Sequence, residues 1–140
     1  MVDHACIKEG AQVRKENIYV SRSFNSLEER LDFIEFRQQL LFTNSDLDRL
    51  IFEYEITQNE YRKIMDLMDQ IRSDLEKGKS VSHGRFEDQI YAIVPTHCGD
   101  YHMCEYIARA FMDEGRWEEV FPALYGHMPK YQFLKDKNDD

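Results

Sequence analysis

Four side chains that can ligate a metal or act as nucleophiles stand close together in the second half of the chain: His97, Cys98, His102 and Cys104. Imidazole nitrogen and thiolate sulfur are ligands that zinc readily accepts. The two cysteines lack the Cys-x-x-Cys spacing of a structural zinc site, however, and a second half-site does not follow. A complete site would need Cys6, His83 or His127 to fold back onto this segment.

A thiol nucleophile is the other chemistry that this segment suggests, with Cys98 beside His97 or His102 as the base. Catalytic partners usually come together from different elements, so sequence neighbours rarely form such a pair. A free cysteine more often behaves as a small buried hydrophobic residue. We therefore expect residues 97–104 to serve in helix capping and core packing, with no metal, no cofactor and no catalytic residue. A metal- or thiol-dependent enzyme that uses this segment is the alternative.

Two kinds of phosphate recognition fit the sequence poorly. The glycine-bounded loop at 78–84 lacks the GxxxxGK[ST] spacing of a phosphate-binding loop, and no hydrophobic strand precedes it. The chain carries 18 Lys and Arg against 27 Asp and Glu, and its formal charge of -9 repels nucleic-acid backbones. A helix-turn-helix at 45–71 would present Asp66, Asp69 and Asp74 to the groove. We expect no nucleic-acid partner.

The composition is typical of one folded helical domain. A length of 140 residues suffices to bury a core, and 42% hydrophobic with 13% aromatic residues is ordinary for a folded chain. Only 6 Gly and 3 Pro favour helices over loop-rich designs. No apolar run approaches the length needed to span a bilayer, so we expect no membrane partner. Three cysteines without a signal-peptide pattern predict a cytoplasmic location.

The longest predicted helix covers residues 58–77. Thr57 and Glu60 have the spacing of a capping box, and Lys77 with Gly78 marks the other end. Its apolar residues recur at steps of three and four: Tyr61, Ile64, Met65, Met68, Ile71 and Leu75. This spacing predicts one packed face and one solvated face.

A helix predicted after Ser26 has a wider apolar surface than one packing partner requires. One stripe consists of Leu27, Leu31, Ile34 and Leu41. A second set lies beside it and supplies our candidate interface residues: Phe33, Phe36, Leu40 and Phe42. Such breadth indicates either a central position in a bundle or a subunit interface, and we expect the latter, most simply in a homodimer.

Further helices are predicted from Asp46 to before Thr57, and at 86–94, 101–114 and 117–125. Asp100 is the expected N-cap of the third of these. The last follows Gly115 as an αα-hairpin, and Pro122 either bends it or opens a new turn. The fold class is therefore all-α, a compact bundle of about six helices.

The chain divides into three segments. Residues 1–25 form an N-terminal arm that is weakly structured or contains a short strand at 17–20, since no sustained period is present. Residues 26–134 form the helical bundle domain, and residues 135–140 are expected to be a disordered acidic tail.

Several segments resemble a known family in their order and spacing: Arg30–Phe33, Ile56–Glu60 opening a long helix, Ile64–Leu67 and Ala110–Trp117. The chain resembles the YhaI-like family of small Bacillus proteins, whose function is unknown. The resemblance spans residues 26–125 and includes no catalytic motif. It implies an all-α bundle in a Gram-positive bacterium or in a phage that infects one. The arm at 1–25 and Pro122 depart from the family's pattern.

The functional expectation is protein–protein interaction without catalysis. It rests on the wide apolar surface of the first helix, the arm without a packing pattern and the lack of catalytic spacings. We expect a modulator or antagonist of a host protein, of phage or Gram-positive origin.

Overall fold

A computed structural model of the chain describes residues 22–133, and every regular element within them is an α-helix or a 3-10 helix. The prediction of an all-α bundle with about six helices is confirmed. The strand predicted at 17–20, most of the arm at 1–25, and the tail at 135–140 lie outside the described residues.

The helices run in the order α1 (Leu27–Thr43), α2 (Asp46–Glu53), α3 (Gln58–Glu76), α4 (His83–Ile93), α5 (Tyr101–Asp113) and α6 (Val120–Tyr125), with 3-10 turns η3 (Pro95–His97) and η4 (Pro129–Tyr131). Side-chain caps explain where the first five begin. In each, the side chain of the N-cap residue accepts the backbone N–H of the third residue of the helix, and these N-cap residues are Ser26, Ser45, Thr57, Ser82 and Asp100. In α3 the capping box is complete, because Glu60 also accepts from the backbone N–H of Thr57.

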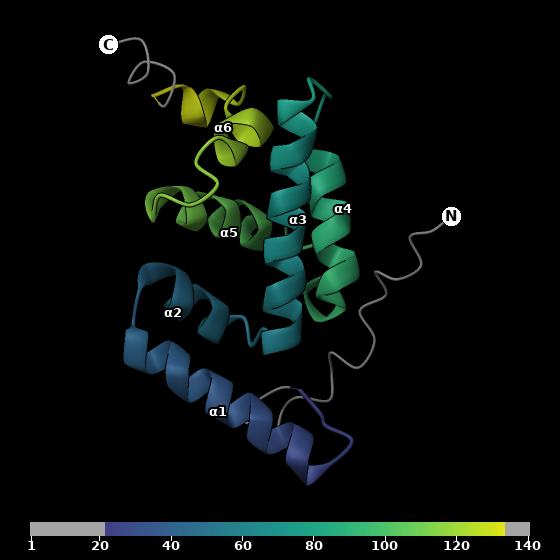
Figure 1. Cartoon of the computed structure of the whole chain (residues 1–140), viewed down its shortest axis with the longest axis vertical. Coiled ribbons are helices and arrows are strands. Elements are labelled where there is room, and N and C mark those ends of the chain that lie inside the picture. Colours follow the sequence, from purple (N-terminus) through teal and green to yellow (C-terminus); the bar gives the residue numbers. More distant parts are fainter. Residues whose placement is uncertain (1–21, 134–140) are drawn as a thin grey trace.

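Helix α3 is the longest of them and packs against α4 and α6. Figure 1 shows α3 and α4 side by side, α5 next to them, α1 with α2 at one end and α6 toward the other. Contacts between α2 and α5 join the α1–α2 pair to the rest of the bundle. Residues from every helix meet in one apolar cluster, which includes Leu47, Ile64, Met68, Phe111 and Phe121.

The segment after α5 differs from the prediction. We expected a helix from residue 117, but residues 114–119 form turns and α6 begins only at Val120. Trp117 has a left-handed φ of 49°, and its indole N–H donates to Asp69 of α3 at 2.8 Å. Pro122 lies in the first turn of α6, where its missing N–H removes no helical bond. The proline therefore opens this helix rather than bending it.

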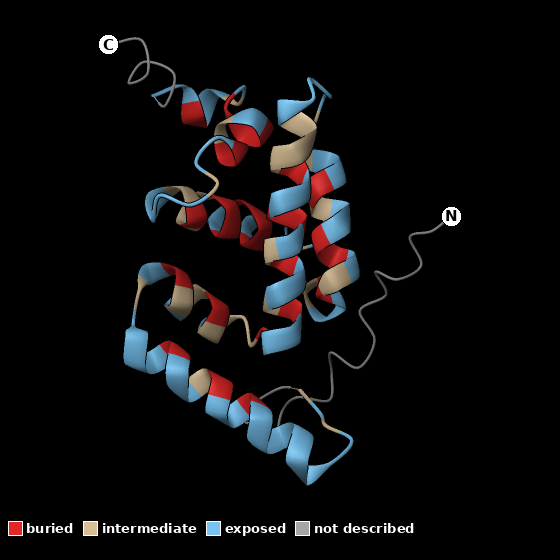
Figure 2. Cartoon of the chain, in the orientation of Figure 1, coloured by how far each residue is buried: buried red, intermediate tan, exposed pale blue. Residues whose placement is uncertain are grey.

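Helix α1 is packed along one side only. Figure 2 shows it exposed over most of its surface, with buried residues toward α2. Arg37 links α1 to α2: it donates to the carbonyl oxygen of Phe52 at 2.8 Å, and its guanidinium lies 3.7 Å from the centre of the Phe52 ring. None of the helices in residues 22–133 combines the length and the apolar content that crossing a membrane requires.

Candidate functional site

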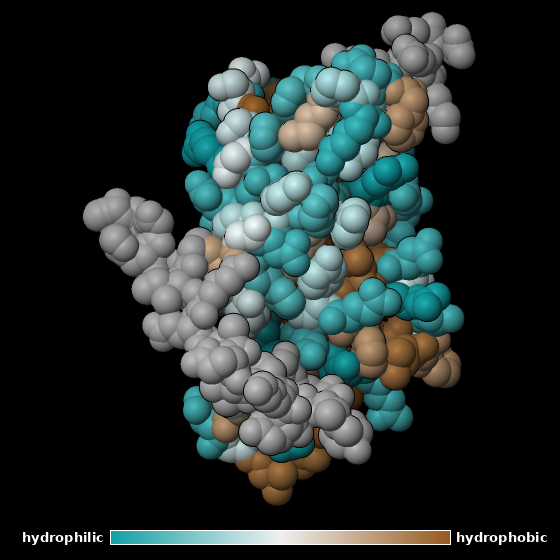
Figure 3. Space-filling view, turned by 180° about the vertical axis from the view of Figure 1, so that it is seen from behind, coloured by the Kyte–Doolittle hydropathy of each residue, from teal (hydrophilic) through white to brown (hydrophobic). Residues whose placement is uncertain are grey.

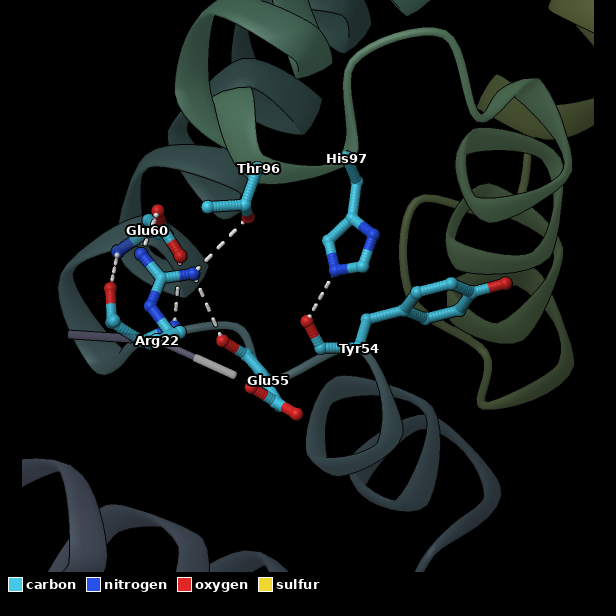
Figure 4. A network of polar contacts seen from close by, with 7 residues as sticks. Arg22, Tyr54, Glu55, Glu60, Thr96 and His97 are labelled. Carbon is cyan, nitrogen blue, oxygen red and sulfur yellow. Dashed lines mark hydrogen bonds and ion pairs between the residues drawn. The ribbon is translucent and has the colours of Figure 1, made fainter. Parts of the chain in front are cut away.

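The structure distributes the four candidate ligands of residues 97–104 over different surroundings. His97 lies in η3, where its Nε2 is 2.7 Å from the carbonyl oxygen of Tyr54 and its ring meets the Tyr54 ring edge-on (Figure 4). Cys98 and Cys104 are buried, whereas His102 is exposed on α5. Within the described residues, no group of three or more His, Cys, Asp or Glu side chains is placed to hold a metal ion.

Cys104 is poorly suited to nucleophilic chemistry. Its side chain is fully buried, and burial raises the pKa of the thiol well above its ordinary value, with the nearby Glu87 carboxylate adding to the effect. A thiol with a raised pKa stays protonated at neutral pH, and the thiolate is the reactive form. The Sγ atom lies 3.8 Å from the carbonyl oxygen of Asp100, as expected for a core position near the start of α5.

His102 belongs to a short row of exposed rings on α5. The His102 ring centre lies 4.2 Å from that of Tyr101 and 5.9 Å from that of Tyr106. His102 Nδ1 is also 4.0 Å from a carboxylate oxygen of Glu105. The imidazole thus stands on the surface, away from the buried thiol of Cys104.

A second polar cluster, around Arg22, was not predicted. The guanidinium pairs with Glu60 (Nη2 to Oε2, 2.9 Å) and donates to the carbonyl oxygen of Glu55 at 3.1 Å and the hydroxyl of Thr96 at 3.3 Å (Figure 4). The other oxygen of Glu60 accepts the N–H of Thr57. The cluster joins residue 22 to the α2–α3 connection and to η3, so its role is structural. Sequence spacing gave no sign of it, because Arg22 and Glu60 are 38 positions apart.

Glu105 is the most buried carboxylate of the described residues, with 2% of its surface exposed. Tyr131 donates to Oε1 at 2.8 Å, and Lys130 Nζ lies 2.8 Å from the same oxygen. Burial favours the neutral acid, but the hydrogen bonds from Lys130 and Tyr131 outweigh it and hold the pKa of Glu105 below its usual value. Because these partners occupy the carboxylate, it anchors η4 to α5 and has no proton to supply at neutral pH.

The candidate interface residues on α1 require a correction. Phe33, Phe36 and Leu40 are buried against their own chain, at 4%, 7% and 4% exposure, and are unavailable to a partner. At 3.6 residues per turn these three positions share one side of α1, which is the side that packs on α2. Phe42 remains a candidate, with 90% of its surface exposed.

The exposed apolar surface of α1 is formed instead by the other stripe together with Phe42. We call it the outer face of α1, and its members are Leu27, Leu31, Ile34, Leu41 and Phe42. Each is between 47% and 90% exposed. In Figure 3 hydrophobic side chains gather at the end of the molecule that α1 forms. Large apolar residues contiguous on one helix face are uncommon on a monomer's surface and mark interaction sites.

This outer face is the candidate functional site. The sequence indicates an apolar stripe on this helix, because Leu27, Leu31, Ile34 and Leu41 recur at helical steps. It does not decide which of the two apolar sets of α1 faces outward. No protein-family model matches this chain, and no match was found among curated proteins or among solved structures.

Proposed function

We propose that this protein acts by binding protein, without a reaction of its own, and that it self-associates through the outer face of α1. The supporting observation is the exposure of five large apolar side chains on a single helix. Complete burial of a Leu, Ile or Phe side chain is worth roughly 1.5–3 kcal/mol, so covering such a face in two copies supplies a substantial driving force.

A two-fold dimer is the simplest form of this association. One surface patch then covers its own counterpart, and two-fold dimers are the commonest oligomers of soluble proteins. Helix α1 lies at one end of the bundle, where a second copy can approach without displacing the other helices (Figure 1). Its inner side is already satisfied by Phe33, Phe36 and Leu40.

Three of the groups with catalytic potential are used in structural contacts, which is consistent with a binding role. His97 contacts the Tyr54 carbonyl, Cys104 is a buried thiol and Glu105 is paired with Lys130 and Tyr131. The resemblance to the YhaI-like family and the formal charge of -9 suit a small acidic modulator in a Gram-positive or phage setting. We propose a host protein as the target of the assembled dimer.

Light scattering on the purified chain over a range of micromolar concentrations tests the self-association. We expect a dimer for the parent and a folded monomer for Ile34→Glu, because a carboxylate at the centre of the outer face would be buried without a partner. Gln39→Glu is the matched control, with the same charge change at an exposed position of α1 outside that face. It should remain dimeric.

Circular dichroism should give the same helical signal for all three proteins. A parent that is monomeric throughout the range would refute self-association. A dimer that persists in Ile34→Glu would place the contact on another surface.

A further inference from the structure

The outer face of α1 carries a regular spacing that says how a second copy would pack on it. Residues 27, 31, 34, 38 and 41 follow one another at steps of four, three, four and three, and all are exposed. This alternation is the core pattern of a coiled coil, in which such residues form the seam between two helices. We call this set the seam: Leu27, Leu31, Ile34, Gln38 and Leu41. It lies roughly opposite the buried set of Phe33, Phe36 and Leu40.

We propose that two copies of this chain pack their α1 helices in parallel, as a short two-stranded coiled coil along this seam. The inference rests on the proposed self-association and adds its geometry. A helix of 17 residues is roughly 25 Å long, so each copy supplies a little over two heptads.

The charges beside the seam support the parallel arrangement. Glu28 and Glu35 lie along one edge, and Arg30 lies along the other, all exposed. In a parallel pair the two unlike edges meet, and a residue on one edge pairs with the residue five positions on in the second helix. Arg30 then faces Glu35 of the second copy, and by symmetry this ion pair forms twice.

An antiparallel pair would bring like edges together. The glutamates of one copy would then lie against those of the other, and Arg30 would lie on the edge facing the other copy's arginines. Like charges that face each other across a contact are destabilising. Helix α1 therefore offers charge complementarity to a second copy in one direction only.

Gln38 gives an independent reason for the same direction. It is the polar member of the seam, and a polar residue at one such position fixes register and orientation at a cost in stability. In a parallel pair Gln38 meets Gln38 of the second copy, and each amide can both donate and accept a hydrogen bond. In an antiparallel pair it would face leucine or isoleucine, and its amide would be buried without a partner.

The remainder of the bundle leaves room for this contact. Phe36 points to the opposite side of α1 from the seam, toward α2 and the core. In a parallel two-fold pair the two bundles consequently lie on opposite sides of the paired helices. Figure 2 shows the long exposed side of α1 that the second copy would cover.

Disulfide cross-linking measures the direction directly. Leu27 and Leu41 stand at the two ends of the seam and are 72% and 53% exposed, so a cysteine at either position should be tolerated. In the parallel arrangement Leu27→Cys should cross-link to itself on mild oxidation, and so should Leu41→Cys. The parent chain, with its native cysteines, is the control treated under the same conditions.

An equimolar mixture of the two cysteine variants discriminates the alternatives. Cross-linking only between Leu27→Cys and Leu41→Cys, and in neither variant alone, would show an antiparallel dimer and overturn the inference while the proposed self-association stands. A parent that is monomeric by light scattering would instead remove the proposed function. A dimer that yields no cross-link through either cysteine would overturn both the parallel arrangement and the proposed use of the outer face of α1 in self-association.

Charge exchange gives a second readout that does not require oxidation. Arg30→Glu should weaken the dimer about tenfold, since two ion pairs become two repulsions. The double variant Arg30→Glu/Glu35→Arg should recover most of the parent's affinity, because the pairs re-form with their signs exchanged. Failure of the double variant to recover affinity would contradict the parallel pairing.

Discussion

At the scale of single residues, Glu105 shows how a buried charge is kept. Its carboxylate lies at the inner side of α5 and would be costly to bury alone, but Lys130 and Tyr131 approach it from η4. These contacts of Lys130 and Tyr131 therefore compensate the charge of Glu105 and also hold η4 against α5.

Replacement of Glu105 by Gln should lower the free energy of unfolding by about 1–3 kcal/mol at neutral pH, because the hydrogen bonds to a charged acceptor are lost. Urea unfolding followed by circular dichroism measures this difference. Glu118→Gln, at an exposed position, is the control and should leave the midpoint unchanged.

The effect of Glu105→Gln on the free energy of unfolding should depend on pH. The folded-state pKa of Glu105 lies below its unfolded value, so the carboxylate stabilises the fold above the unfolded pKa of about 4.3. That contribution disappears as the pH falls through the folded pKa. The gap between the parent and Glu105→Gln should accordingly close below about pH 4. A gap that stayed constant down to pH 3 would argue against a stabilising carboxylate.

At the scale of elements, α1 is unusual in being apolar on two opposite sides. One side completes the core with Phe36 and Leu40, and the other forms the outer face. Such a helix gains nothing more from its own chain once the inner side is packed. Its outer side is free to contact another molecule.

Substitutions of two phenylalanines on α1 test whether one side of the helix is buried in the core and the other is exposed. Phe36→Ala should cost about 3–5 kcal/mol of unfolding free energy, because it opens a cavity in the core. Phe42→Ala should change it by less than about 0.5 kcal/mol in the monomer, since its side chain is 90% exposed. Equilibrium denaturation in the Ile34→Glu background measures both without interference from association. Equal effects of the two substitutions would mean that α1 is rotated from the orientation described.

At the scale of the whole molecule, association should be visible in thermal stability. A dimer that forms only from folded chains is stabilised by mass action, so the melting temperature of the parent should rise with protein concentration. Ile34→Glu should melt at a temperature that does not depend on concentration. Differential scanning calorimetry of both proteins over a hundredfold range of concentration checks this. A parent that melts independently of concentration would speak against the dimer.

The elements themselves were largely predictable, because their signals are local. Thr57 and Glu60 are three positions apart and fix the start of α3, and Asp100 was correctly expected to cap α5. The last helix was correctly expected, but its predicted start at residue 117 was wrong, because Trp117 is held by Asp69 of α3, 48 positions away, with a φ that a right-handed α-helix does not contain. A local pattern carries no information about such a contact.

The sequence by itself determined that this chain is helical, where most helices begin, and that α1 is apolar on more sides than one. Capping and periodicity depend on residues that are close together in the chain, so helix starts and apolar faces can be predicted from the sequence alone. Only the tertiary structure decided which side of α1 faces the core, since Phe33 and Phe36 offer as much apolar surface as Leu31 and Ile34. That choice depends on the surface that α2 presents to α1, and the same packing that buries the phenylalanines leaves the leucine stripe in water.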